Sequence, residues 1–418
     1  MEKRLDRFAI ASSTVVTYLI TVGSVSAQIV PDHTLPVNSR VTPGCTTCTI
    51  EGGTVRGSNL FHSFREFSVP VGGEAFFNNP PEIENIFSRV TGSNLSYING
   101  WIRANGTANL FLLNPNGIIF GPNAQLDIQG SFLASTANSF TFADGSEFGA
   151  TNPQGPPLLT ISVPFGLQYG NNPGNIEVRG SHLQVNPGKT LALVGGDLSI
   201  DGGQLQADGG QIQLGGVTGE GTVGSVANSY EPSLNFPLAD DLPLSDVSLH
   251  NGTKINVSAN GDGKIAIDAR NLTMAGESRL QAGSSGLESS NSNPGDIEIN
   301  ATEAINLTES SSIENLVFSE AMGKGGDINI RTRSLSLSGG ANVVAHTFGR
   351  GNAGNVTINA SGAISLDGAS TGIGSQVFEN AVGNGGNITI TTGTLSLSDG
   401  ATLPRQYLRA GKCRQCHH

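Results

Sequence analysis

The sequence predicts an all-β protein built as a parallel β-helix, a solenoid in which successive coils of chain stack on one another. Two observations lead to this prediction. The 418 residues include 57 glycines, with only 6% aromatic and 13% charged residues, a composition that favours strands joined by tight turns over helices. In addition, a segment of alternating apolar residues recurs at a nearly constant spacing in the second half of the chain.

The recurring segment is a glycine followed by a short alternating strand. Its copies are GKIAIDA, GDIEINA, GDINIRT, GNVTINA and GNITITT, beginning at Gly263, Gly295, Gly326, Gly354 and Gly386, so the period is about 31 residues. A second alternating strand follows each copy (LSLSGGAN, AISLDGAS), and then a weaker third strand (NVVAHTFG). Three strands per repeat predict a right-handed, single-stranded parallel β-helix of the pectin-lyase-like class rather than a propeller, whose blades have four strands.

Alternation places the apolar residues of each repeat on one face. Ile328 and Ile330 point to one side of the first strand, and Leu335 and Leu337 to one side of the second. A single repeat cannot bury these faces, but stacked repeats bury them continuously. We attribute the glycines at the corners, and the Asp or Asn beside them, to the unusual backbone angles of the turns.

A polar residue follows the leading glycine of each later repeat. These positions are Asp296, Asp327, Asn355 and Asn387. They admit two interpretations, a row of calcium ligands or a hydrogen-bonded ladder inside the turns. The glycine-rich nonapeptide typical of calcium-binding β-helices is absent, so the sequence favours the ladder.

The chain divides into six segments. We predict a signal peptide at 1–27, an N-terminal module at 28–165, coils at 166–225, an irregular excursion at 226–250, repeats at 251–402 and an out-of-frame tail at 403–418. The coils contain shorter alternating segments such as DLSIDGG and QIQLGG, whereas the excursion is rich in proline and acidic residues.

The first residues form an export signal. Lys3, Arg4 and Arg7 precede the apolar stretch Phe8–Val22, and Val25-Ser26-Ala27 is a small-residue site that predicts cleavage after Ala27. The alternative, a core helix, would not explain these three features in this order. No later apolar run is long enough to predict a transmembrane anchor in the mature chain.

Charge and cysteines exclude several kinds of partner. A net charge of −12 argues against a nucleic-acid partner. Cys45 and Cys48 form a C-x-x-C that is either a local disulfide or two free thiols, since no further metal ligands stand nearby. We predict no cofactor and no metal.

The chain ends in KCRQCHH, in which Cys413, Cys416 and His417 have the spacing of a c-type haem attachment site. We disfavour a haem because the tail is cationic and interrupts the repeat. Codons can be chosen for residues 405–418 so that the same bases, read from the second base onward, encode VNTFGQGNAGNVT. That sequence resembles the repeat at residues 345–357. The tail is therefore interpreted as an out-of-frame end.

Residues 51–148 differ from the repeats and carry the most specific motif. It is NPNGI, formed by Asn114, Pro115, Asn116, Gly117 and Ile118, with NLFHSF before it and SFLAST after it. On these residues the chain resembles the secretion domain of two-partner secretion exoproteins, also called the filamentous haemagglutinin N-terminal domain. That family has a second, upstream motif, N-P-N-L, whose divergent counterpart here is Asn78, Asn79 and Pro80.

The residues of NPNG alone predict a tight turn between two strands, because Pro fixes φ, Asn bonds its own backbone and Gly permits positive φ. The resemblance implies that this turn is needed for secretion. It also implies a secreted, surface-exposed, adhesin-like exoprotein whose N-terminal module is recognised by the periplasmic POTRA domains of an outer-membrane barrel transporter. We expect the module to seed β-helix folding, and the ligand to be an undetermined surface or carbohydrate.

Two alternatives remain open. Parallel β-helices also include polysaccharide-degrading enzymes, which need clustered carboxylates on one face. Asp240, Asp241 and Asp246 lie in the irregular segment and are interpreted as a solvated loop, so no catalytic residue is nominated and we predict that the chain is not an enzyme. The other alternative is an autotransporter passenger, against which the N-terminal resemblance argues.

Overall fold

The computed structural model describes residues 28–151, 153, 164–224, 242–260, 263–286 and 295–403. These residues form 36 strands and no helix. The predicted signal peptide with its cleavage site after Ala27, and Cys413, Cys416 and His417 of the tail, lie outside the described residues.

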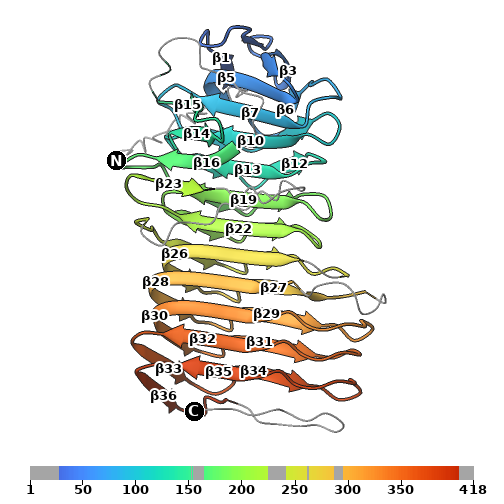
Figure 1. The fold of residues 1–418 in the computed structure, drawn as a ribbon, viewed down its shortest axis with the longest axis vertical. Coiled ribbons are helices and arrows are strands. Elements are labelled where there is room, and N and C mark those ends of the chain that lie inside the picture. The colour runs from blue at the N-terminus through green and yellow to red at the C-terminus, as the bar shows by residue number, and fades with distance from the viewer. Residues whose placement is uncertain are drawn as a thin grey trace, which may run out of the picture.

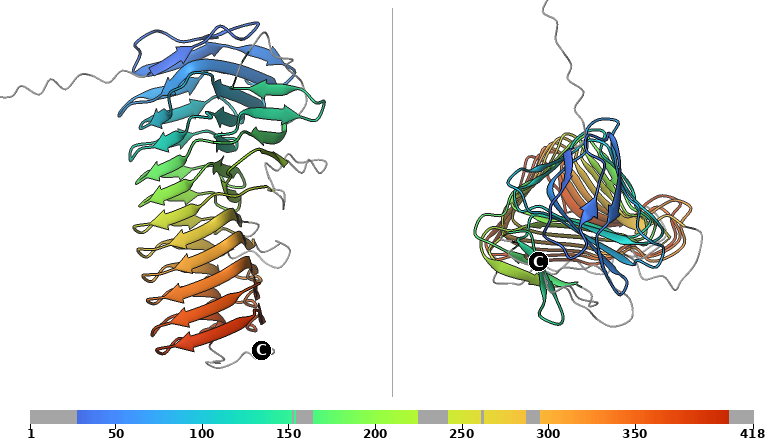
Figure 2. Two further views of the ribbon diagram at one scale, coloured as in Figure 1. Left: turned by 90° about the vertical axis from the view of Figure 1, so that its left-hand side faces the viewer. Right: turned by 90° about the horizontal axis from the view of Figure 1, so that it is seen from above.

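The strands are stacked into one continuous column that runs from the N-terminal residues at one end to the C-terminal repeats at the other (Figure 1). Viewed along the column, the coils superimpose on a roughly triangular outline (Figure 2). Nearly all neighbouring strands of successive coils pair in parallel. This arrangement confirms the predicted parallel β-helix, whereas its right-handed, pectin-lyase-like form stays a prediction.

Three sheets form the column. The largest comprises β1 (Gln28–Pro31), β4 (Thr54–Arg56), β5 (Asn59–Ser68), β7 (Asn85–Val90), β8 (Ser96–Ile98), β10 (Asn109–Leu113), β11 (Ile118–Phe120), β13 (Phe132–Ser135), β17 (Ile176–Arg179), β19 (Thr190–Gly195), β20 (Leu198–Asp201), β22 (Gln211–Gly216), β24 (Val247–His250), β26 (Lys264–Met274), β28 (Ile297–Leu307), β30 (Ile328–Ser338), β32 (Val356–Ala360), β33 (Ala363–Asp367), β35 (Ile388–Thr391) and β36 (Thr394–Ser398). The second comprises β2 (Ser39–Arg40), β3 (Thr47–Gly52), β6 (Glu74–Phe77), β9 (Trp101–Ala104) and β12 (Gln125–Asp127). The third comprises β18 (His182–Gln184), β21 (Gln204–Gln206), β25 (Lys254–Asn256), β27 (Arg279–Ser284), β29 (Ser312–Val317), β31 (Asn342–Thr347) and β34 (Gly372–Val377).

The interior of the column is a single apolar core. Ile328, Ile330, Leu335 and Leu337 are all at most 1% exposed, as the alternation predicted. Each is paired with its copy in the next coil, for example Ile328 with Val356 and Leu335 with Ile364. The first two strands of a repeat, predicted as separate, run together as one long strand in β26, β28 and β30, with an irregularity in register in the middle.

The leading glycines are required for a reason other than the one that the sequence suggested. They do not have a positive φ. Instead, a Cβ on Gly326 would lie 1.8 Å from the carbonyl oxygen of Gly295, and one on Gly354 would lie 1.8 Å from that of Gly326. The coils therefore approach too closely at this corner for any side chain, so our attribution to backbone angles was wrong for these positions.

The regular stack resumes inside the segment 226–250. Strand β24 begins at Val247, and it pairs in parallel with β20 on one side and β26 on the other. Residues 225–241 lie outside the described part of the chain.

A fourth sheet lies beside the column and was not predicted. It is antiparallel and comprises β15 (Glu147–Gly149), β14 (Ser139–Phe142), β16 (Pro164–Tyr169) and β23 (Gly221–Gly224), in that order. Between it and the column is a second apolar core that contains Phe61, Phe87, Phe111, Phe140, Phe142 and Phe148. Their rings contact one another, with Phe87 and Phe111 stacked at 4.7 Å between centroids. In the N-terminal coils, the large sheet of the column is therefore apolar on both of its faces.

Candidate functional site

The NPNGI motif forms the predicted turn between β10 and β11. The backbone N–H of Gly117 donates to the carbonyl of Asn114 at 3.1 Å. The backbone N–H of Asn116 donates to the side-chain oxygen of Asn114 at 3.0 Å, and Gly117 has a φ of 121°. The residue types thus fulfil the turn roles that their chemistry predicts.

The Asn114 side chain is fully buried and joins the turn to the preceding coil. Its Nδ2 donates to the carbonyl of Asn94 at 3.1 Å and to the hydroxyl of Ser96 at 2.9 Å. Its Oδ1 also accepts from Nδ2 of Asn116 at 2.9 Å, and that Nδ2 donates in turn to the carbonyl of Gly92. Both donors and both acceptor positions of the Asn114 amide are therefore occupied.

The opposite side of the turn contacts the following coil. The N–H of Ile118 donates to the carbonyl of Asn175 at 3.0 Å, and the N–H of Gly174 donates to the carbonyl of Pro115 at 2.9 Å. A Cβ on Gly174 would lie 2.4 Å from the backbone of Asn116. One turn thus holds three successive coils in register.

The divergent second motif makes a similar connection at another corner. Asn79 is 4% exposed, and its Nδ2 donates to the carbonyl of Asn105 while its Oδ1 accepts from the N–H of Asn105 at 2.9 Å. The side chain of Asn105 returns to Oδ1 of Asn78 at 2.9 Å. Asn78 and Asn79 therefore join their coil to the next coil, and Pro80 accepts the N–H of Ile83 in the following turn.

Comparison with known proteins agrees with these features. The family model of the TPS secretion domain matches residues 27–267, which is more than half of the chain. The chain belongs to the TPS secretion domain family. The match begins at the end of the predicted signal peptide, continues past residue 165 and includes the first coils that follow the N-terminal module.

A solved structure shows the same fold. The secretion domain of HMW1 from Haemophilus influenzae superimposes with a TM-score of 0.57 at 17% identity, covering 90% of this chain and 97% of that one. The filamentous haemagglutinin secretion domain gives a TM-score of 0.37 at 14% identity, with 90% and 99% covered. A curated relative, the haem/hemopexin-binding protein of Haemophilus influenzae, is 33% identical over 72 residues, which cover 17% of this chain and only 8% of the relative.

Membership of the TPS secretion domain family makes this chain a secreted exoprotein of the two-partner type. The family and the fold are those of a secretion domain rather than of an enzyme. Among the described residues, no helix is long and apolar enough to span a bilayer.

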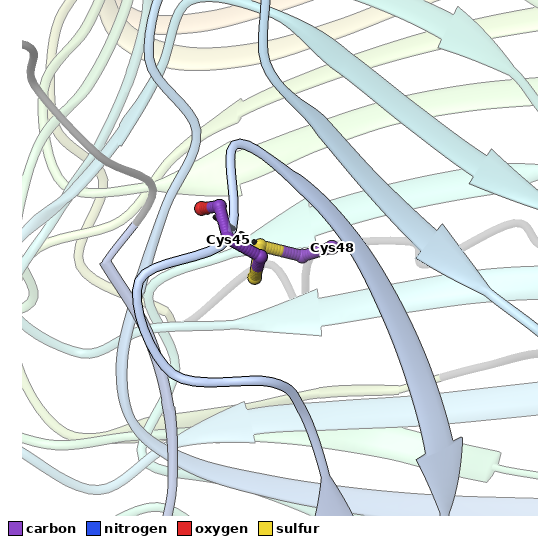
Figure 3. Close-up of a disulfide and its surroundings, with 2 residues drawn as sticks. All are labelled: Cys45 and Cys48. Carbon is purple, nitrogen blue, oxygen red and sulfur yellow. Dashed lines mark hydrogen bonds between the residues drawn. A yellow bond between two sulfur atoms is a disulfide. The ribbon is translucent and has the colours of Figure 1, made fainter.

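The C-x-x-C of the secretion domain is disulfide-bonded. Cys45 and Cys48 have an Sγ–Sγ distance of 1.96 Å; Cys45 lies before β3 and Cys48 within it (Figure 3). Cys48 is buried in the column core. Within the described residues there is no group of three or more His, Cys, Asp or Glu that could hold a metal ion.

A buried arginine lies between the N-terminal strand and the flanking sheet. Arg89 is 1% exposed and donates to the hydroxyls of Ser63 and Thr34, each at 2.9 Å, and to the carbonyl of Gly149. Its guanidinium lies 4.3 Å from the ring centroid of Phe148. Burial lowers the pKa of Arg89 to about 10, which the Asp32 carboxylate partly offsets, so Arg89 remains charged at neutral pH.

Asp32 is the acidic partner in this network. It accepts from the hydroxyls of Thr34 at 2.6 Å, Ser63 at 2.7 Å and Thr91 at 2.6 Å. Burial alone would raise the pKa of Asp32, but these hydrogen bonds outweigh it and leave the pKa below its ordinary value. The residues just after the predicted cleavage site are thereby fixed to strands β5 and β7. The sequence offered one signal for this network, a lone Arg inside the apolar segment IFSRV.

Acid is expected to destabilise the mature chain through buried histidines. Burial lowers the pKa of His62 from 6.5 to about 3 and that of His346 to about 4. The unfolded chain therefore binds protons below about pH 6.5 that the folded chain does not, so stability falls as the pH falls from there toward the folded values. At pH 5, the lowered pKa of each histidine should reduce the free energy of unfolding by about 2 kcal/mol. Urea unfolding at pH 7 and pH 5 measures this.

In that experiment the variant His62→Asn should lose part of the pH dependence, whereas His33→Asn, at an exposed position, should keep all of it. If the stability of the His62→Asn variant depended on pH as strongly as that of the wild type, buried His62 would not contribute to destabilisation in acid.

The polar residues that follow the leading glycines form a hydrogen-bonded ladder, as predicted. Oδ1 of Asp296 accepts from the backbone of Asp327 at 2.7 Å, Asp327 accepts from Asn355 at 2.8 Å, and Asn355 accepts from Asn387 at 2.9 Å. Burial, together with the nearby Asp327 charge, raises the pKa of Asp296 above its ordinary value despite that hydrogen bond. These oxygens are committed to the backbone of the next coil.

Of the three carboxylates considered for catalysis, the structure describes Asp246. Asp246 forms an ion pair with Arg270 at 2.7 Å, and hydrogen bonding to Arg270 lowers its pKa. Asp240 and Asp241 lie outside the described residues.

Proposed function

We propose that the N-terminal module of this chain is recognised by periplasmic POTRA domains of a dedicated outer-membrane barrel transporter, and that it seeds folding of the β-helix outside the cell. The observation that carries the proposal is the NPNGI turn, whose Asn114 is fully buried and which joins three successive coils by side-chain and backbone hydrogen bonds. A turn of this kind fixes the spacing of the first coils, and each later coil then needs only its neighbour as a template.

The same architecture supports passage through a pore. Each coil contacts only the coils next to it, so the chain can cross unfolded and fold as it emerges. The Cys45–Cys48 bridge closes a loop of only a few residues, which does not prevent an extended chain from passing. We further propose that the exported stack acts at the cell surface as an adhesin.

Replacing Asn114 by alanine should stop export. The change leaves the hydroxyl of Ser96 and the carbonyl of Asn94 without their buried partner, at a cost of about 2–4 kcal/mol, and it loosens the turn. In cells that carry the transporter, we expect the Asn114→Ala chain to accumulate in the periplasm, as measured by the ratio of periplasmic to extracellular protein.

Asn359→Ala, which changes an exposed asparagine of β32, is the matched control and should be exported normally. Deleting residues 51–134 should abolish export entirely. Normal surface delivery of that deletion would contradict the proposal.

A further inference from the structure

A polar groove lies on the outward face of the third sheet. It has a volume of about 200 Å³ and crosses three successive strands, β21, β25 and β27. The middle residues Leu205 and Ile255 line its base, with their side chains turned into the core. Its walls are two columns of side chains, Gln204, Lys254 and Arg279 on one side and Gln206, Asn256 and Gln281 on the other.

The two cations of this groove are less closely paired with carboxylates than several cations elsewhere on the column. In the described part of the chain, Lys264, Arg270 and Arg333 each contact a carboxylate at 2.7–2.8 Å. Lys254 is exposed and has no ion pair among the described residues. The half-exposed Arg279 has only Glu314, at 3.6 Å.

The groove therefore combines amides with a guanidinium that has one long ion pair and an ammonium that has none among the described residues. The Gln204 side chain makes no hydrogen bond within the described residues, and the Gln281 side chain has only a long one, at 3.5 Å to Ser258. An amide both donates and accepts, so a row of amides is suited to hydroxyl groups, which also do both. The ammonium and the guanidinium are suited to carboxylates. The residues that line the groove include two cations and no carboxylate, in a chain with a net charge of −12.

We propose that this groove binds an acidic polysaccharide, a sugar chain that carries carboxylates. Lys254 and Arg279 would bind the carboxylates, and Gln204 and Gln281 the neighbouring hydroxyls. The strands repeat about every 4.8 Å along the column, so the rungs of β25 and β27 each offer one cation and one amide to successive sugars. The inference rests on the proposed function in one respect, that the groove faces the medium after export.

The test uses the purified mature chain and three probes, a short oligogalacturonate, a neutral cello-oligosaccharide of equal length and polyglutamate, with affinities measured by calorimetry. The double variant Lys254→Gln/Arg279→Gln should bind oligogalacturonate at least about tenfold more weakly than the wild type, because charged hydrogen bonds are lost. The matched control Lys324→Gln/Arg350→Gln, which removes two other exposed cations, should bind like the wild type.

The variant Gln204→Ala/Gln281→Ala separates sugar recognition from charge attraction. It should weaken binding of oligogalacturonate while leaving any binding of polyglutamate unchanged. Equal affinity of the wild type for oligogalacturonate and polyglutamate, equal affinity for the neutral sugar, or equal loss in the control variant would overturn the proposal. Because binding is measured on purified protein, its failure is distinguishable from a failure of export, which none of these variants should affect.

Discussion

Replacing Gly326 by alanine should destabilise the mature chain by at least about 4 kcal/mol, among the largest effects of any single substitution. A Cβ at this position would lie 1.8 Å from the carbonyl oxygen of Gly295 and 2.6 Å from its carbonyl carbon. Both atoms belong to backbone, so neither can move away without separating the two coils. Separation would in turn weaken the ladder between Asp296 and Asp327 and the parallel pairing of β28 with β30.

The measurement is urea unfolding, with hydrogen exchange of the amides in β28 and β30 as the local readout. Gly149→Ala is the matched control, because a Cβ there would meet its nearest atom at 3.6 Å, an ordinary contact. A Gly326→Ala chain as stable as the Gly149→Ala chain would show that the coils do not approach as closely as described.

Replacing Arg89 by methionine should have the second large effect, lowering the free energy of unfolding by about 3–5 kcal/mol. Methionine keeps the apolar stem but leaves the half-buried Asp32 without a nearby cation, and it removes the donors to Ser63, Thr34 and Gly149. The damage should be local to the N-terminal strand and the flanking sheet, since those are the elements that Arg89 joins.

The double variant Asp32→Asn/Arg89→Met distinguishes an uncompensated charge from lost packing. Removing the carboxylate as well should recover part of the stability, as measured by chemical unfolding of all four chains in a double-mutant cycle. No recovery would mean that the cost lies in the hydrogen bonds and the contact with Phe148 rather than in the charge of Asp32.

The column was predictable because its determinants are periodic. Ile328, Ile330, Leu335 and Leu337 alternate with polar residues and recur once per repeat, and all of them are buried where the alternation places them. The NPNGI turn was predictable for a different reason, since each of its residues has a local conformational preference. In both cases the information lies within a few residues of the chain.

The flanking sheet and the Arg89 network depend on contacts between distant segments, and the repeat pattern does not encode them. One signal was present. Strand β7, Asn85–Val90, is buried at every position, with Ile86 in the column core and Phe87 in the second core. A strand that is apolar on both faces requires a covering layer on each side. Similarly, the close approach of Gly326 and Gly295 follows from stacking geometry, which a sequence pattern does not reveal.

If the N-terminal module is the template on which the remaining coils fold, it must become ordered before them. Pulse-labelling hydrogen exchange during refolding of the mature chain measures this order. Amides in β5, β7 and β10 should become protected first, followed by those in β26, β28 and β30 in order along the column. Earlier protection of β28 and β30 than of β5, β7 and β10 would contradict it.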